Sequence, residues 1–378
     1  MSLSNLRIAI IMPLAEQRGG GELMLLDLMQ HGRDAGVTWL VIFMEDGPMR
    51  TQIEGYGVET RLVPSGRLRE PHKFVGAIRE IAQIARSWQA SALLGWMGKS
   101  NLYGGPASAL AGIPCFWYQL SVPVDKNWID RIANALPTRA VLTLSKAAQV
   151  AQSEFWPRRP VSLVYPGVGL DRFDPSRLPA PVEVRERLAL PEPYRVGPLI
   201  GIVGRLQRWK GMHVLIDAMP SILAQQPDAH ALIVGGKHDM EPDYEPFLQE
   251  RIRTLGLEER VLMTGLQRNV PEWMQAMDVV IHASDNEPFG IVVIEAMALG
   301  KPVVAGAEGG PQEIITEGVD GLLAPYGDAA RLSGAILRYL NTPDFADQTG
   351  AAARLKALTF STENYAHNCI QALRQYLG

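Results

Sequence analysis

The chain has 378 residues, of which 47% are hydrophobic and 20% charged, as in a globular enzyme rather than a disordered or fibrous protein. This length exceeds one ordinary core, so two domains are expected. The apolar runs are too short for a membrane span, and no charged-then-apolar leader is present, which argues against export. The only cysteines, Cys115 and Cys369, favour a reducing cytoplasm.

The net charge of −4 divides unevenly along the chain. Residues 1–165 carry 17 Lys and Arg against 13 Asp and Glu, whereas the remainder carries 19 against 27. A basic first half suits an anionic membrane surface or a phosphorylated acceptor. Ordinary scatter of surface charge explains the same numbers equally well.

The first half alternates apolar runs with segments of helical periodicity. Residues 7–13 are expected to form a buried parallel strand, glycines 19–21 a turn, and residues 22–31 a helix. The other elements expected here are strands at 37–44, 91–95, 114–118 and 140–144 and a helix at 74–88. Strands that alternate with helices predict βαβ units around a parallel sheet.

Prolines mark the middle of the chain. Nine of the 27 prolines fall between Pro157 and Pro198. Such a segment resists regular structure, so we expect residues 166–197 to connect two domains.

A second βαβ series follows this segment. The expected strands are at 199–203, 230–234, 261–264, 279–283 and 302–305, and the expected helices are at 212–223, 247–255 and 270–277, with a final pair of helices and a turn at 321–323. The fold class is therefore α/β, with two Rossmann-like, doubly wound parallel-sheet domains. Such domains predict a ligand cleft at the carboxyl ends of their strands.

Two glutamates eight residues apart, Glu287 and Glu295, are the most informative local feature. Glu287 lies in a loop punctuated by Pro288 and Gly290, and Glu295 lies about one turn into the helix that begins near Gly290. Free N–H groups at a helix N-terminus suit a phosphate, and carboxylates suit sugar hydroxyls. The pair therefore predicts a nucleotide-sugar site.

Two cations precede this motif. Arg205 and Lys210 lie between a strand and a helix, where they suit a diphosphate, and Gly204 and Gly211 let the backbone approach it closely. A strand-end Gly-Arg is often only a turn, but the later glutamates favour the functional interpretation. Residues 309–313, Gly-Gly-Pro-Gln-Glu, fit either the site or a turn that caps a helix.

In this order, the motifs resemble the retaining glycosyltransferases of family 4, which have the GT-B fold. The resemblance covers nearly the whole chain and rests on residues 19–22, 165–168, 204–206 with 210–211, 287–295, 309–313 and 321–323. It implies a metal-independent transfer of a sugar from a UDP or GDP donor to a hydroxyl acceptor, in bacterial polysaccharide, lipopolysaccharide or glycolipid synthesis. It also implies a first, acceptor-binding domain over 1–165, completed by a helix at about 362–378, and a donor domain over 198–361.

The same resemblance implies roles for individual residues. Arg205 and Lys210 would hold the donor diphosphate and stabilise the leaving group, and Glu287 would bind the sugar hydroxyls. Glu295 would bind the ribose. The other donor-binding positions it implies are Gly20, Gly21, Gly204, Gln267, Arg268, Pro288, Phe289 and Gly290.

No cofactor or metal is expected. The chain contains no Asp-x-Asp and no histidines at ligand spacing, and two cations with a helix N-terminus can neutralise a departing diphosphate. The chain also lacks a histidine that many relatives carry in the first domain. Lys99 is the polar candidate there, and Trp96, Trp117 and Tyr118 are candidates for stacking on an acceptor sugar, although aromatics at strand ends are more often core.

Other interpretations remain open at this point. The basic helix at 74–88, preceded by Arg67, Arg69 and Lys73, could dock on a membrane or simply pack on the sheet. A nucleotide-sugar epimerase or hydrolase, or a non-catalytic nucleotide-sugar-binding subunit, would use the same architecture. An NAD-dependent dehydrogenase is poorly supported because glycines 19–21 do not form Gly-x-Gly-x-x-Gly. No nucleic acid partner is expected.

Overall fold

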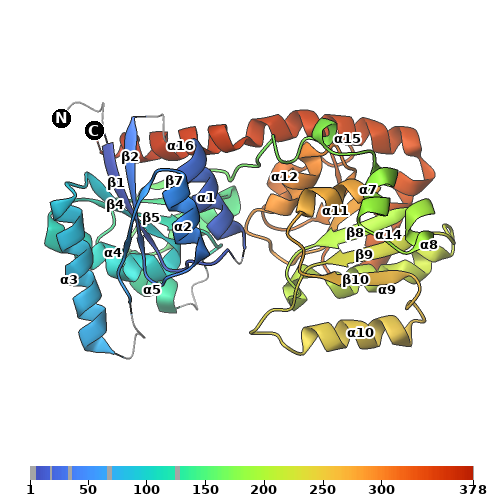
Figure 1. Cartoon of the computed structure of the whole chain (residues 1–378), viewed down its shortest axis with the longest axis horizontal. Coiled ribbons are helices and arrows are strands. Elements are labelled where there is room, and N and C mark those ends of the chain that lie inside the picture. The colour runs from blue at the N-terminus through green and yellow to red at the C-terminus, as the bar shows by residue number, and fades with distance from the viewer. Residues whose placement is uncertain (1–5, 18, 33–35, 66–69, 124–127, 378) are drawn as a thin grey trace. The chain divides into compact units, whose positions relative to one another are not determined.

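The computed structural model describes residues 6–17, 19–32, 36–65, 70–123 and 128–377 and divides into two compact units (Figure 1). The first unit comprises Met1–Gly167 and Thr362–Gly378, and the second comprises Val168–Ser361. The proline-rich segment therefore belongs mainly to the second unit.

The first unit is built on a parallel sheet of seven strands in the order β3-β2-β1-β4-β5-β6-β7. The strands are β1 Leu6–Met12, β2 Val37–Phe43, β3 Glu59–Leu62, β4 Ala92–Trp96, β5 Cys115–Gln119, β6 Ala140–Thr143 and β7 Val161–Leu163. The helices are α1 Gly20–His31, α2 Pro48–Gly55, α3 Pro71–Ser87, α4 Met97–Ala111, α5 Trp128–Ala135, α6 Lys146–Glu154 and α16 Thr362–Gln375. Helix α16, red in Figure 1, packs on the blue helix α1.

Helix α3 corresponds to the basic helix expected at 74–88. Its buried residues, Ala77, Ile78, Ile81, Ala82 and Ala85, form one face. The helix packs against α4, and its Phe74 ring lies 4.7 Å from that of Tyr103. The apolar face is therefore occupied inside the unit, as in the packing interpretation. Arg67 and Arg69 lie outside the described residues.

The second unit contains a parallel sheet of six strands in the order β10-β9-β8-β11-β12-β13. Its strands are β8 Leu199–Val203, β9 His230–Val234, β10 Val261–Gly265, β11 Val279–His282, β12 Val303–Gly306 and β13 Leu322–Ala324. Its α-helices are α7 Pro181–Arg187, α8 Glu192–Val196, α9 Met212–Leu223, α10 Tyr244–Thr254, α11 Val270–Ala276, α12 Ile291–Ala298, α13 Pro311–Ile314, α14 Ala329–Asn341 and α15 Pro343–Ala357. Three short 3-10 helices complete it: η1 Pro175–Arg177, η2 Arg208–Lys210 and η3 Leu358–Phe360.

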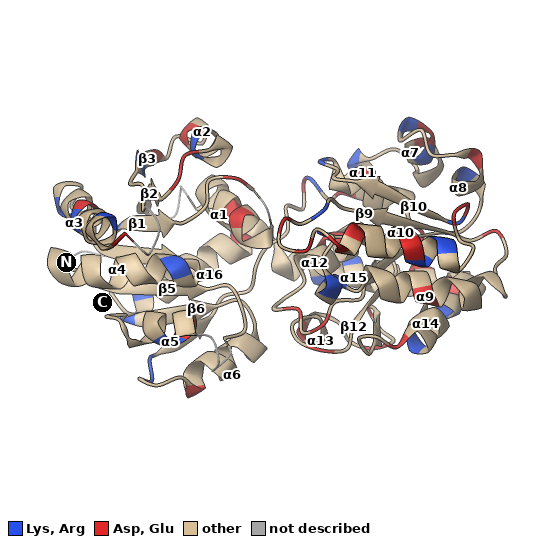
Figure 2. Ribbon diagram, turned by 90° about the horizontal axis from the view of Figure 1, so that it is seen from below, with Lys and Arg blue, Asp and Glu red and all other residues tan. Residues whose placement is uncertain are grey.

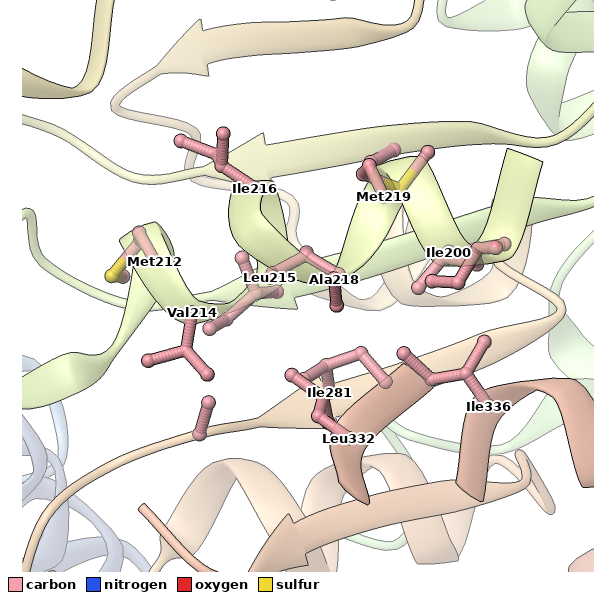
Figure 3. Close-up of a cluster of buried hydrophobic side chains, with 14 of the residues drawn as sticks. Ile200, Met212, Val214, Leu215, Ile216, Ala218, Met219, Ile281, Leu332 and Ile336 are labelled. Atoms are coloured by element: carbon pink, nitrogen blue, oxygen red, sulfur yellow. The ribbon is translucent and has the colours of Figure 1, made fainter. Parts of the chain in front are cut away.

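One apolar cluster joins helix α9 to the sheet and to α14 (Figure 3). Its members on α9 include Met212, Leu215 and Met219, which are fully buried. Ile200 of β8 and Ile281 of β11 meet them, and Leu332 and Ile336 approach from α14. This packing fixes the start of α9 relative to the ends of β8 and β11.

Two local expectations are wrong. The segment at 321–323 is not a free turn, because Leu322–Ala324 forms strand β13 beside β12. The proline-rich segment contains helices α7 and α8, in which a proline stands in the first turn, where a backbone N–H is not needed. In the first unit, strands β3 and β7 and helices α2, α4, α5 and α6 were not expected at all.

Charge is mixed over both units. Figure 2 shows basic and acidic residues interspersed rather than gathered into one block. On α10, for example, Arg253 pairs with Glu250. In the described part of the chain, no helix combines the length and apolarity needed to cross a bilayer.

Candidate functional site

The second sheet has a point at which its strand order reverses. The strands β9 and β10 lie on one side of β8, and β11, β12 and β13 lie on the other. The loops that leave β8 and β11 flank this point at the carboxyl ends of the strands, which is where open α/β sheets bind ligands. The loop after β8 carries Arg205 and Lys210, and the loop after β11 carries Glu287.

A glycine brings these two loops into contact. Gly211 has φ 74°, and a Cβ there would lie 2.1 Å from the carbonyl oxygen of Ala283. The Asp285 N–H also donates to the Trp209 carbonyl at 2.7 Å. A larger residue at 211 would separate the loops and carry Lys210 away from β11.

Four polar residues gather where the loops meet: Lys210, His282, Ser284 and Glu287, here called the Glu287 cluster. The Lys210 Nζ lies 2.5 Å from Glu287 Oε2, and the side chains are 16% and 12% exposed. The His282 Nε2 lies 3.1 Å from the same oxygen. Ser284 Oγ lies 3.2 Å from His282 Nε2.

The carboxylate of Glu287 is held in its charged form. Burial raises the pKa of this group, but attraction to Lys210 and hydrogen bonds from His282 and Lys210 outweigh burial and lower the pKa to about 2. Glu287 is therefore an acceptor of hydrogen bonds at neutral pH, as binding of a sugar hydroxyl requires.

The turn at 309–310 supports the loop that carries Glu287. The Gly310 N–H donates to the Glu287 carbonyl at 2.8 Å, and a Cβ on Gly310 would lie 2.2 Å from the Phe289 Cα. Glu313 stands in the first turn of α13. The glycine pair thus both begins a helix and shapes the loop.

Glu295 lies on α12 and differs from Glu287. Its side chain is buried, and no hydrogen bond reaches its carboxyl group from the rest of the described chain. Burial raises its pKa to about 7, and the nearby Arg172 only partly opposes this. A buried carboxyl group without partners is costly to ionise, so it is suited to ligand hydroxyls that supply the missing hydrogen bonds.

Arg205 follows β8 and approaches a residue that the sequence motifs did not identify. Its Nη1 lies 3.4 Å from Nε2 of His238, in the loop after β9. The two loops are in close contact, because a Cβ on Gly235 would lie 1.7 Å from the Gly204 carbonyl oxygen. His238 belongs to no motif, and only the packing of these loops reveals it.

The remaining donor-side positions have mixed surroundings. Gln267 donates to the Thr264 carbonyl at 2.9 Å, so its amide is already engaged, whereas Arg268 is exposed. Pro288 is half-buried. Phe289 is 2% exposed and packs edge-on against Phe360, so its ring belongs to the core of the loop. Gly290, with φ 103°, is the residue before α12.

The first sheet also reverses its order, between β1 and β4, and the predicted residues of the first unit flank that point. Gly20 and Gly21 begin α1 after β1, and a Cβ on Gly21 would lie 2.6 Å from the Met97 Cε. Met97 has φ 69°, a strained conformation for this residue type. Lys99 is exposed in the first turn of α4.

The structure corrects the prediction that three aromatic residues on the acceptor side stack on a sugar. Trp96, Trp117 and Tyr118 are each fully buried. Trp96 Nε1 donates to the Gly21 carbonyl at 2.9 Å, and the Tyr118 hydroxyl donates to the Val164 carbonyl at 2.8 Å. A ring without exposed surface cannot stack on a sugar, so these residues are core and Lys99 remains the candidate.

Across the residues that the structure describes, no group of three or more His, Cys, Asp or Glu side chains is placed to hold a metal ion.

Comparison with known sequences finds similar proteins for the domain that holds these loops. Residues 191–356 match the family described as Glycosyl transferases group 1. A D-inositol 3-phosphate glycosyltransferase of Corynebacterium urealyticum is 34% identical over 220 residues, which is 57% of this chain and 51% of the relative. The lipopolysaccharide core biosynthesis mannosyltransferase LpsB of Rhizobium meliloti is 29% identical over 209 residues, 55% of this chain and 57% of the relative. The chain spans about half the length of the curated relatives it matches.

Solved structures match over nearly the whole chain. The crystal structure of Anabaena Alr3699/HepE in complex with UDP has a TM-score of 0.86 and 26% identity, and covers 98% of this chain and 100% of that one. The same protein in complex with UDP-glucose gives a TM-score of 0.85. WaaG, described as a glycosyltransferase of lipopolysaccharide biosynthesis, has a TM-score of 0.73 at 16% identity and matches in fold.

Proposed function

We propose that this chain, which has the GT-B fold and carries a glycosyl transferase group 1 domain, transfers a sugar from a nucleoside-diphosphate donor to a hydroxyl acceptor. The carrying observation is the Glu287 cluster. It places a cation suited to a diphosphate beside a carboxylate suited to sugar hydroxyls, on two loops at the point where the strand order reverses. UDP is the first candidate nucleotide because HepE, which is similar over nearly the full length, binds UDP and UDP-glucose.

The proposed reaction retains the anomeric configuration and needs no metal. The acceptor oxygen forms a bond to the anomeric carbon while the bond from that carbon to the phosphate oxygen breaks. The bonding electron pair leaves with the diphosphate, whose new negative charge Arg205 and Lys210 neutralise. The acceptor proton passes to the departing phosphate oxygen. In this scheme Glu287 binds hydroxyls and is not a nucleophile, and Glu295 binds the ribose.

A binding measurement tests the donor site directly. Thermal unfolding is followed with UDP, GDP, ADP and their sugars, with and without EDTA. We expect one nucleotide to raise the Tm equally in both conditions, and Lys210→Met to lose most of that increase. Lys356→Met is the matched control, because this substitution removes a comparable ion pair of the same unit, between Lys356 and Asp320 at 2.8 Å. A shift that EDTA removes would refute the metal-free site, and no shift at all would refute the diphosphate site.

Product analysis separates transfer from its alternatives. An epimerase or hydrolase would consume the nucleotide sugar without an acceptor, and a non-catalytic binding subunit would leave it intact. We expect turnover to depend on an added saccharide or glycolipid acceptor, with loss of transfer in Glu295→Ala and Lys210→Ala variants that remain folded.

The proposed acceptor belongs to polysaccharide, lipopolysaccharide or glycolipid synthesis, in line with the names of the relatives. A lipid-linked acceptor would require contact with the inner membrane face. The first unit exposes Trp128 and Ile132 on α5 with Arg131 between them, and Trp156 after α6. Sedimentation with anionic and neutral vesicles tests this contact. If the protein binds neither anionic nor neutral vesicles, a water-soluble acceptor is favoured.

A further inference from the structure

His282 is a buried polar residue at the end of a core strand. It is the last residue of β11, and its side chain is 3% exposed. Its Nε2 lies 3.1 Å from Glu287 Oε2 and 3.2 Å from Ser284 Oγ. A buried position favours apolar residues, so a histidine here carries a desolvation cost that some interaction must offset.

The surroundings of the ring select one tautomer. A carboxylate can only accept a hydrogen bond, so the contact with Glu287 requires a proton on Nε2. The Nδ1 has no hydrogen-bond partner within the described chain. His282 also lines a cavity of about 10 Å³ whose other walls are apolar, including Val214 and Leu332. The contact with Glu287 therefore fixes the proton on Nε2, and nothing in the described chain competes for the ring from the Nδ1 side.

Glu287 is held from one side only. Both Lys210 and His282 contact Oε2, and no hydrogen bond from the described residues reaches Oε1. A carboxylate anchored through one oxygen presents the other in a fixed direction. Oε1 is therefore the oxygen left for a ligand hydroxyl.

Two anionic groups, the Glu287 carboxylate and the donor diphosphate, would interact with Lys210. It pairs with Glu287. A bound diphosphate carries more negative charge than the carboxylate and competes for the same ammonium group. When Lys210 turns toward the diphosphate, His282 remains as a donor to Oε2.

We propose that His282 is a positioning residue that keeps the Glu287 carboxylate oriented toward the donor sugar while Lys210 engages the diphosphate. This inference rests on the proposed function. It predicts that the imidazole acts on the sugar end of the donor and leaves the nucleotide end unaffected.

The first test is spectroscopic and needs no substrate. Long-range ¹⁵N–¹H NMR of the histidine rings, with the His282 signal assigned by its loss in His282→Gln, reports the tautomer. We expect a proton on Nε2, both before and after UDP is added. A ring that carries its proton on Nδ1 and none on Nε2, in either state, would overturn the inference, because Nε2 could not then donate to Glu287.

The second test separates positioning from a merely structural role. His282→Leu removes the donor from the strand, whereas His282→Gln keeps an N–H donor. We expect His282→Leu to bind UDP within about threefold of the wild-type affinity. With the nucleotide sugar that the wild-type protein turns over, its kcat should fall at least tenfold at a nearly unchanged KM, and His282→Gln should recover most of that loss. Equal losses in both variants, or a parallel loss of UDP binding, would overturn it.

Failure of the proposed function gives a different pattern. An Nε2–H tautomer in a wild-type protein that binds none of UDP, GDP and ADP would overturn the donor site and with it the role toward a sugar. Normal UDP binding with an Nδ1–H tautomer would overturn the inference on His282 alone.

Discussion

Replacement of Glu295 by glutamine should make the protein more stable and its nucleotide site weaker. Glu295 is 7% exposed on α12, and the described residues donate no hydrogen bond to it. Burial raises the pKa of its carboxyl from the ordinary 4.5 to about 7. The folded protein therefore favours the protonated form, and ionisation of the carboxyl group costs stability.

The sign and size of the effect follow from the two pKa values. Between pH 4.5 and about 7 the unfolded chain releases this proton and the folded chain retains it, so the free energy of unfolding falls as the pH rises. Above pH 7 the loss amounts to about 3 kcal/mol at most. In a domain of about 200 residues, 1 kcal/mol shifts the Tm by roughly 2–4 °C. Glutamine is neutral at every pH and avoids this loss.

Scanning calorimetry at pH 4.5, 6 and 8 measures the effect. We expect wild type and Glu295→Gln to have similar Tm values at pH 4.5, and the variant to be several degrees more stable at pH 8. Because hydrogen bonds to a charged group contribute about 1.5–3 kcal/mol, the variant should bind UDP at least about tenfold more weakly at pH 8.

The control is Glu258→Gln, an exposed glutamate of the same unit, which should show no pH-dependent gain. A stability difference between wild type and Glu295→Gln that does not change from pH 4.5 to 8 would refute the reasoning about burial. Unchanged UDP binding in the variant would refute the ribose-binding role separately.

Three further perturbations test the packing and charge of the second unit. Gly235→Ala places a Cβ 1.7 Å from the Gly204 carbonyl oxygen. In urea unfolding this variant should lose about 1–3 kcal/mol of stability, and UDP should no longer stabilise it. The control Gly334→Ala, which has open space on α14, should be neutral or slightly stabilising. Arg185→Met removes a buried guanidinium that donates to the Ala276 and Gly197 carbonyls and to Asp278, so urea unfolding should show a loss of about 3–5 kcal/mol; less than about 1 kcal/mol would contradict this. Lys210→Met should remove the stabilisation that comes from the lowered pKa of Glu287. Relative to wild type, the loss in Tm should be full above pH 4.5 and should shrink as the pH falls toward 2. A loss that grows in acid would be inconsistent with the ion pair.

The architecture was largely predictable because its signals are local. The apolar runs at β1, β8 and β11 lie in strands buried on both faces, so they read as continuous hydrophobic segments. Short strands carry no such signal: β7 and β13 have three residues each and are defined only by pairing with β6 and β12.

Helix α4 shows how tertiary packing overrides propensity. Its sequence contains Gly104, Gly105 and Pro106, which disfavour a helix when read alone. In the fold, a Cβ on Gly104 would lie 3.1 Å from Ile11, and one on Gly105 would lie 2.9 Å from Leu136. The glycines therefore allow close packing of this helix on its neighbours, and that contact has no signature in the sequence.

The residue types of the site were readable from spacing, but their surroundings were not. Spacing and a strand-to-helix context predicted Lys210, Glu287 and Glu295 as candidates. Only the tertiary structure decided that Lys210 and His282 share one oxygen of the Glu287 carboxylate and that Glu295 is buried. The tertiary structure also decided that Trp96, Trp117 and Tyr118 belong to the core. The reason is physical: periodicity reports which face of an element is apolar, whereas burial, pKa and hydrogen bonding depend on segments that meet only after the chain has folded.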